Sequence, residues 1–206
     1  LTYGPMRAKP RRLHHGSNSQ FSSTGEHTPF MLKEMYTENP ELADLVNNFG
    51  QISGLYDEIV VNTIKTKVKD NPFVVQIRKS DKFFYVDELG YGVGQILPII
   101  TDLYFCAPGA SFLIQQLELH LHPRAQAALG DVFYSKMIEG SSLVIETHSD
   151  FIVDRFRMSQ KKSDQVFRSQ VIYFDKSTDG FNLCHEIEID KDGSFVNPPE
   201  NFRSFF

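Results

Sequence analysis

The chain has 206 residues, of which 41% are hydrophobic and 23% charged, and these proportions allow one sizeable buried core. Its net charge of −5 and isoelectric point near 5.8 exclude a protein whose whole surface is built to hold nucleic acid. No apolar run approaches the roughly 18 residues that span a bilayer, and the first residues lack a signal-peptide pattern. We therefore expect a cytoplasmic domain without membrane contact.

Two basic stretches remain as candidate DNA contacts within this acidic chain, and an ordinary solvated surface is the alternative for each. The basic residues are Arg7, Lys9, Arg11, Arg12, His14 and His15 in the first stretch, and Arg155, Arg157, Lys161, Lys162 and Arg168 in the second.

The two cysteines, Cys106 and Cys184, lie in apolar or alternating surroundings without the spacing of metal ligands. We expect both to be small core residues of a reduced protein, with no disulfide between them.

The first half of the chain alternates loop-like and periodic segments. Residues 1–30 are rich in Gly, Ser, Pro, Arg and His without a sustained period, which predicts a long loop. Apolar spacing over residues 39–69 predicts two amphipathic helices, broken near residues 50–54. Two short apolar strands, residues 73–78 and 83–86, flank a turn and predict a β-hairpin.

The second half predicts an α/β core. A Gly-rich turn at residues 90–95 leads into an apolar helix that reaches residue 105. Apolar strands at 111–116 and 142–146 alternate with helices at 123–138 and 149–158, a pattern that implies a parallel sheet with crossover helices.

Residues 166–174 and 181–189 are predicted as terminal strands joined by a turn at residues 177–180. The remaining segment, 190–206, is rich in Pro, Asn and Phe, and we expect it to form a tail that packs on the body.

Polar side chains follow the two apolar strands of the predicted parallel sheet, where ligands of such sheets bind. Oxygen ligands and imidazoles at these strand ends could bind Mg²⁺, orient a water or contact a phosphate. Alternatively, His120 and His122 are turn histidines, and Thr147 and Ser149 are helix N-caps with Asp150 in the first turn.

A zinc site from His120, His122 and His148 is a further alternative, although no Cys and no H-E-x-x-H pattern supports it. A metal-dependent hydrolase is the corresponding enzyme hypothesis, and it would use Glu118, His120, His122, Glu146, His148 and Asp150.

Three segments carry a resemblance to SMC-like ABC ATPases. Residues 112–126 resemble the Walker B and D-loop segment of a subgroup whose pattern is I-E-E/Q-P-E-x-H-L-H-P-x-x-Q. Residues 145–149 resemble the switch-histidine segment, and residues 92–95 resemble a shortened ABC signature. Shorter segments at 3–7, 25–29 and 198–202 are similar to members from prokaryotic anti-phage defence.

The resemblance implies the C-terminal half of such an ATPase: an α/β lobe with a mainly parallel sheet and flanking helices. It divides the chain into a loop-rich segment at 1–38, a helical segment at 39–71 and the ATPase lobe at 72–206. In this family two protomers hold ATP and Mg²⁺ between them, and the signature of one faces the nucleotide of the other.

The resemblance assigns roles to eleven positions. His148 would stabilise the γ-phosphate, Gln116 stands where the catalytic Glu is expected, and Gln115 stands where the acidic residue associated with Mg²⁺ is expected. The nucleotide-binding signature residues would be Gly92, Val93, Gly94 and Gln95, and the D-loop would comprise Leu119, His120, Leu121 and His122.

Three positions depart from the family pattern, because Gln115 and Gln116 replace acidic residues and Leu117 replaces Pro. Neutral amides bind Mg²⁺ more weakly than carboxylates and cannot accept a proton from water. We therefore expect ATP hydrolysis to be slow or absent.

The sequence contains no G-x-x-x-x-G-K-[ST] motif, so nothing in it can hold phosphates in the manner of a P-loop. We expect either a Walker A half outside this chain or a degenerate partner of a complete ATPase. The resemblance implies a homodimer or higher oligomer, related to Septu, retron-linked and overcoming-lysogenization-defect ATPases, that gates an HNH-type nuclease. A non-enzymatic scaffold is the alternative.

Overall fold

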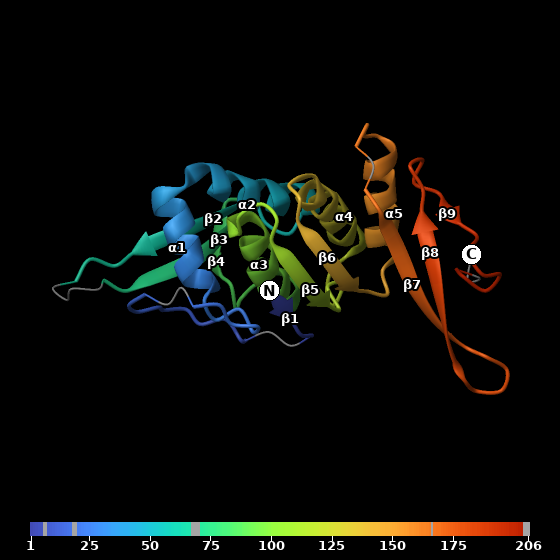
Figure 1. Ribbon diagram of the computed structural model, residues 1–206. Helices are drawn as coiled ribbons and strands as arrows, with labels where there is room; N and C mark the ends of the chain where they lie inside the picture. The colour runs from blue at the N-terminus through green and yellow to red at the C-terminus, as the bar shows by residue number, and fades with distance from the viewer. Residues whose placement is uncertain (6–7, 18–19, 67–70, 166, 204–206) are drawn as a thin grey trace.

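The computed structural model describes residues 1–5, 8–17, 20–66, 71–165 and 167–203 (Figure 1). The predictions for Arg7, for the end of the second helix at 67–69 and for the first residue of the strand at 166–174 lie outside these ranges. The helices are α1 (Thr28–Glu38), α2 (Pro40–Ser53), α3 (Tyr91–Phe105), α4 (Pro123–Ile138) and α5 (Asp150–Lys161). The strands are β1 (Thr2–Tyr3), β2 (Glu58–Thr63), β3 (Phe73–Lys79), β4 (Lys82–Tyr85), β5 (Ser111–Gln115), β6 (Ser142–Glu146), β7 (Ser169–Lys176), β8 (Asn182–Ile189) and β9 (Phe195–Val196).

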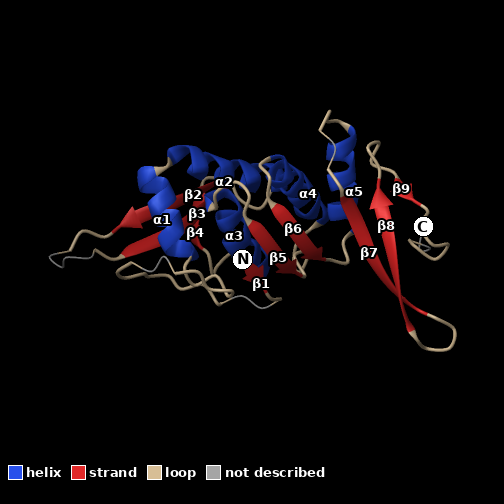
Figure 2. Cartoon of the chain, in the orientation of Figure 1, coloured by secondary structure: helices blue, strands red, loops and turns tan. Residues whose placement is uncertain are grey.

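The central sheet is parallel, with the strand order β1-β5-β6, and α4 makes the crossover from β5 to β6 (Figure 2). Alternate residues of β5 point to the core, where Phe112 and Ile114 are buried in one cluster with residues of α3 and α4. The predicted α/β fold with a parallel sheet and flanking helices is therefore confirmed.

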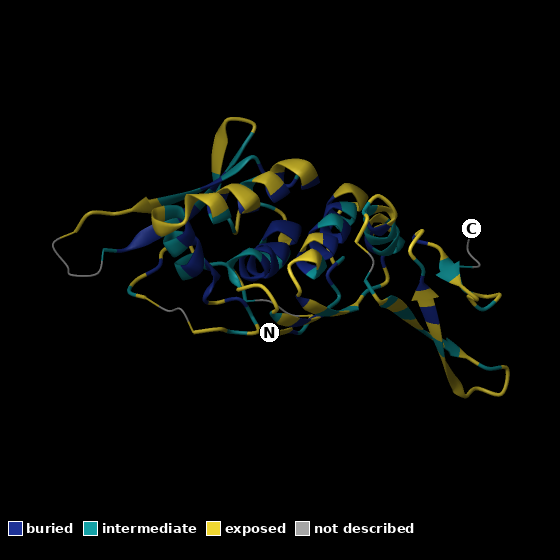
Figure 3. Cartoon of the chain, turned by 45° about the horizontal axis from the view of Figure 1, so that its top comes forward, coloured by how far each residue is buried: buried dark blue, intermediate teal, exposed yellow. Residues whose placement is uncertain are grey.

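Two further sheets, β2-β3-β4 and β7-β8-β9, are antiparallel and lie on opposite sides of the central sheet (Figure 1). The fold therefore combines one parallel sheet with two antiparallel sheets. The predicted hairpin at 73–86 is confirmed as β3 and β4, with Ser80 and Asp81 in the turn at φ values of 49° and 61°. The terminal hairpin is confirmed as β7 and β8, and much of its surface is exposed (Figure 3).

The prediction of a helix after residue 54 is wrong for residues 58–63, which form the strand β2. The side chain of Ile59 is buried, and the strand pairs with β3 over six residues. The β-branched run Ile59, Val60 and Val61 favours an extended chain, and its apolar spacing is too short to distinguish a helix from a strand. The preceding helix is confirmed as α2.

The N-terminal segment is more ordered than the predicted loop. Thr2 and Tyr3 form β1, which pairs with Leu113 and Ile114 of β5. Within the segment that was expected to be rich in loops, α1 occupies Thr28–Glu38, with Pro29 in its first turn and buried Met and Leu side chains on its inner face.

The C-terminal tail packs on the body as predicted. Its β9 strand pairs with β8, and Arg203 contacts α5 through Asp150 and Asp154, each at 2.7 Å. Phe195 of this tail lies under the guanidinium of Arg157, 3.7 Å from the ring centroid.

The expectation of two core cysteines is wrong for Cys184, which is exposed on β8, while Cys106 is partly buried. Burial raises the pKa of the Cys106 thiol. Both cysteines are free, as expected. No helix in the described ranges is long and apolar enough to cross a membrane.

A buried polar network joins three distant parts of the chain. The carboxylate of Asp102, on α3, accepts a hydrogen bond from the Tyr3 hydroxyl and bonds with His27 Nε2 at 3.0 Å. The backbone N–H of Ser22 donates to His27 Nδ1 at 3.1 Å, so Nε2 carries the proton and donates to Asp102. Tyr3, His27 and Asp102 are each no more than 1% exposed.

Replacing Asp102 with Ala should lower the free energy of unfolding by roughly 2 kcal/mol, because the buried His27 Nε2 donor loses its acceptor, while the Tyr3 hydroxyl keeps the Pro98 carbonyl as an acceptor at 3.3 Å. Urea denaturation would measure the loss. The control is Asp164→Ala, at an exposed position, with an expected change within about 0.5 kcal/mol. Equal stability of the two variants would show that the network does not hold the fold.

Candidate functional site

The ends of β5 and β6 lie side by side. Gln115 and Glu146 are register partners, and Gln115 Nε2 donates to Glu146 Oε2 at 2.9 Å. The chain then turns sharply, since Gln116 has a φ of 49° and its N–H donates to the Glu146 carbonyl at 2.9 Å. The two glutamines predicted to stand at the metal and catalytic positions therefore lie at the carboxyl edge of the parallel sheet, as expected for a ligand site.

Glu118 connects the predicted D-loop region to the switch-histidine segment. Its two carboxylate oxygens accept from the Thr147 hydroxyl at 2.6 Å and from the His148 N–H at 2.7 Å. Because both oxygens are engaged, Glu118 fixes the backbone of the switch segment, while His148 itself remains exposed. Sequence reasoning placed Glu118 only in the hydrolase hypothesis and missed this contact.

One of the two predicted helix caps is realised, and His122, which was predicted as a turn histidine, is a second cap. Ser149 is the N-cap of α5, with its hydroxyl accepting from the Ile152 N–H at 3.2 Å. His122 is the N-cap of α4, with Nδ1 accepting from the Ala125 N–H at 3.3 Å. Thr147 is not a cap, although its hydroxyl accepts from the Ser149 N–H at 3.0 Å.

The first turn of α3 packs directly on residues 119–122, the predicted D-loop. A Cβ on Gly92 would lie 2.6 Å from the His120 carbonyl oxygen, so only Gly allows this approach. The rings of Tyr91 and His120 are 5.5 Å apart and tilted by 37°. His120 has a φ of 64°, which fixes the turn that brings its backbone to the helix.

The four predicted signature residues are not equally placed to meet a nucleotide. The helix begins at Tyr91, earlier than predicted, so residues 92–95 form its first turn. Val93 is 5% exposed and belongs to the core, and Gly92 is buried against the D-loop. Gly94 and Gln95 are partly exposed. The backbone N–H groups at this helix start have the polarity that favours an anion.

Arginine contacts tie the same region to α2. Arg124, in the first turn of α4, donates through Nε to the Ile52 carbonyl at 2.6 Å and through Nη2 to the Gln51 carbonyl at 3.1 Å. Both acceptors lie in the last turn of α2, where the Gln51 carbonyl also accepts from the Gly54 N–H at 3.2 Å.

The donor set at the strand ends fits Mg²⁺ better than Zn²⁺. The Gln115 amide oxygen and Glu146 Oε1 have no hydrogen-bond partner within the described part of the chain, and Mg²⁺ prefers oxygen ligands. Among the described residues no three His, Cys, Asp or Glu side chains are grouped to hold a metal, so the structure does not support the zinc site or the metal-dependent hydrolase.

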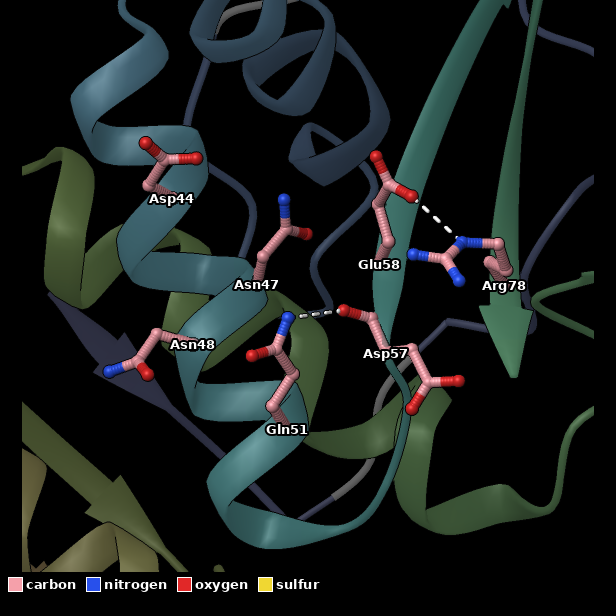
Figure 4. Close-up of a pocket in the computed structure, with 7 residues that line it drawn as sticks. All are labelled: Asp44, Asn47, Asn48, Gln51, Asp57, Glu58 and Arg78. Atoms are coloured by element: carbon pink, nitrogen blue, oxygen red, sulfur yellow. Dashed lines mark hydrogen bonds and ion pairs between the residues drawn. The ribbon is translucent and has the colours of Figure 1, made fainter. Parts of the chain in front are cut away.

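The structure also contains a polar cavity of about 370 Å³ between α2 and the β2-β3 strands, which sequence reasoning did not predict (Figure 4). Its polar groups largely bind one another: Gln51 donates to the Asp57 carbonyl at 2.9 Å, and Arg78 donates to Glu58 at 2.8 Å. That bond raises the pKa of Arg78. None of the resemblance motifs contributes to the lining, which comprises Asp44, Asn47, Asn48, Gln51, Asp57, Glu58 and Arg78.

Several residues of the two basic stretches are paired with carboxylates. Arg12 lies 3.0 Å from Asp87, and Arg155 lies 2.8 Å from Asp131. His14 is buried, and burial lowers its pKa. These contacts favour a structural role for Arg12, His14 and Arg155, while DNA contact stays a prediction for the other exposed basic residues of the two stretches.

A family model described as "AAA domain, putative AbiEii toxin, Type IV TA system" matches residues 35–154, more than half of the chain. The chain belongs to this AAA family. The match includes β5, α4, β6 and the first turn of α3, which are the elements that form the candidate site. No curated protein matches this AAA domain.

Solved structures of SMC ATPase heads have a similar fold. An SmcHead bound to the C-winged helix domain of ScpA superposes with a TM-score of 0.51 at 12% identity, covering 81% of this chain and 50% of that chain. An SMC ATPase structure concerned with ATP-driven dimerization and DNA-stimulated activation superposes with a TM-score of 0.49 at 12% identity, covering 76% of this chain and 88% of that chain. An Smc head domain with an extended coiled coil, bound to the C-terminal domain of ScpA derived from Pyrococcus furiosus, has a TM-score of 0.49 at 13% identity. That match covers 76% of this chain and 37% of the other chain. The AAA chain thus spans about half of the SmcHead chain.

Substituting Gly92 with Ala should destabilise the AAA domain by about 1–3 kcal/mol, because the new methyl group would displace the His120 carbonyl. Differential scanning calorimetry would record a lower Tm. The control is Gly4→Ala, whose Cβ would meet nothing within 4 Å and which lies outside the helices. The packing of α3 on the D-loop is refuted if both variants melt with the wild type.

Removing the Glu118 carboxylate by Glu118→Ala should free the Thr147 and His148 donors and raise the exchange rate of the His148 amide by about tenfold or more. Hydrogen exchange followed by NMR would measure this rate. Glu186→Ala, at an exposed strand position, is the control and should leave it unchanged. Unchanged exchange in Glu118→Ala would mean that the carboxylate does not hold the switch segment.

Proposed function

We propose that this AAA domain is a nucleotide-controlled subunit that contributes signature, D-loop and switch-histidine elements to an ATP and Mg²⁺ site shared by two protomers. The observation that supports this most directly is the contact of the signature turn with the D-loop, where Gly92 meets His120. Glu118 then joins the same loop to His148, so the motifs of the resemblance are physically connected.

The chain's own residues suggest binding without fast turnover. The start of α3 offers backbone N–H groups to a phosphate, and the exposed His148 is free to contact developing charge. Gln116 cannot accept a proton from an attacking water, since its amide is not a base. Bound Mg²⁺ would neutralise phosphate charge beside Gln115.

The β- and γ-phosphates need further support, because the 206 residues contain no P-loop sequence. In this proposal a P-loop outside these residues completes the site, and nucleotide binding controls assembly of two or more copies. The motif resemblance extends the proposal to anti-phage defence of the Septu or retron-linked type, in which the assembled ATPase gates an HNH-type nuclease partner.

A non-enzymatic scaffold is the second candidate. The neutral pair Gln115 and Gln116 favours it, because a site that has lost both acidic positions can persist for assembly alone. Nucleotide binding separates the two candidates.

The test is fluorescent-nucleotide binding and phosphate release by the complete polypeptide with Mg²⁺, beside the double variant Gln115→Glu/Gln116→Glu. Saturable binding is expected in both, with phosphate release near background in the wild type and at least about tenfold faster in the variant, because the carboxylate at 116 supplies a general base and the one at 115 adds a charged metal ligand. Gln165→Glu, which adds a carboxylate at an exposed loop position, is the control and should not raise release.

Absence of nucleotide binding in both proteins would reject the ATPase proposal and leave the scaffold. Fast release by the wild type would instead contradict the inference that the two glutamines suppress turnover.

A further inference from the structure

Glu146 provides a carboxylate within one hydrogen bond of the position where the sequence has lost one. It is the last residue of β6 and the register partner of Gln115, so the two side chains project from the same face of the parallel sheet. Gln115 Nε2 and Glu146 Oε2 are 2.9 Å apart. A carboxylate therefore remains at the strand ends, one strand away from the expected position.

The direction of this hydrogen bond leaves two oxygens available. Gln115 uses its amide N–H to reach Oε2, so its amide oxygen and Glu146 Oε1 have no partner in the described ranges. These two side chains thus offer an amide oxygen and a carboxylate oxygen, which are ligands that a hard divalent cation accepts.

The neighbouring carboxylates are already occupied. Both oxygens of Glu118 accept hydrogen bonds from the switch segment. Asp150 is paired with Arg203 at 2.7 Å. Glu146 is exposed and lies in no ion pair with Lys, Arg or His among the described residues, so its negative charge is not neutralised.

We propose that Glu146 is the acidic ligand of the nucleotide-associated Mg²⁺ and replaces, from the adjacent strand, the carboxylate absent at Gln115. Gln115 then positions Glu146 through its amide N–H and contributes its own oxygen. Mg²⁺ sites at phosphates commonly use one or two carboxylates, with phosphate oxygens and waters completing the shell. This inference rests on the proposed function for the identity of the phosphate ligand, but the metal contact can be measured separately.

The experiment measures Mn²⁺ affinity of the complete polypeptide by electron paramagnetic resonance, with and without ATP, and ATP affinity in EDTA. Glu146→Gln keeps the shape of the side chain and removes its charge. It should weaken Mn²⁺ binding at least about tenfold, because one charged ligand is lost, and should not weaken ATP binding in EDTA, where no metal connects this carboxylate to the phosphates. Glu186→Gln, an exposed glutamate on β8, is the matched control and should change neither affinity.

The charge-relocated variant Gln115→Glu/Glu146→Gln moves the carboxylate back to β5 and should restore Mn²⁺ affinity to within about threefold of the wild type. Wild-type Mn²⁺ affinity in Glu146→Gln, with or without ATP, would overturn the assignment and reduce the bond to Gln115 to a structural contact between strands. Failure of every protein to bind ATP would reject the proposed function, and the Mn²⁺ titration without ATP would still decide the role of Glu146.

Discussion

The buried carboxylate of Asp102 determines how the parts of this AAA domain are placed. Asp102 lies on α3, and its two hydrogen-bonding partners belong to β1 and to the residue before α1. Because β1 pairs with β5, the network fixes the helix that carries the signature turn relative to the strand that carries Gln115. A buried polar group of this kind is stable only when each partner is present, so it selects one arrangement of these elements.

The candidate site follows from that arrangement. With α3 in place, the first turn of the helix reaches His120 of the predicted D-loop, an approach that a side chain on Gly92 would prevent. Glu118 fixes the switch segment to the same loop through two charge-assisted hydrogen bonds. The site is therefore a set of loops at one edge of a rigid sheet, and its chemistry depends on which oxygen atoms remain free there.

Family membership and the likeness to SMC heads establish the architecture, while the nucleotide chemistry has to be argued from individual side chains. The sequence alone suggested that replacement of the acidic residues at 115 and 116 had removed negative charge from the site. In the fold, Glu146 lies within hydrogen-bonding distance of Gln115, so the charge at this edge is displaced to the neighbouring strand. A motif can therefore lack an acidic residue while the site that it forms still carries a negative charge.

The sequence by itself determined the elements with strong local signals. The bounds of α4 and β6 agree with the predicted 123–138 and 142–146, since Pro begins the helix and an apolar run forms the strand. Only tertiary structure decided that Glu58–Thr63 is a strand, because pairing with β3 resolves an apolar pattern that also fits a helix. The two-residue β1 is too short to show any period, and it exists through its pairing with β5. The contact of Gln115 with Glu146 depends on the register between two strands that are joined by a helical crossover. Such a crossover, unlike a tight hairpin turn, does not fix by its length which residues lie opposite each other.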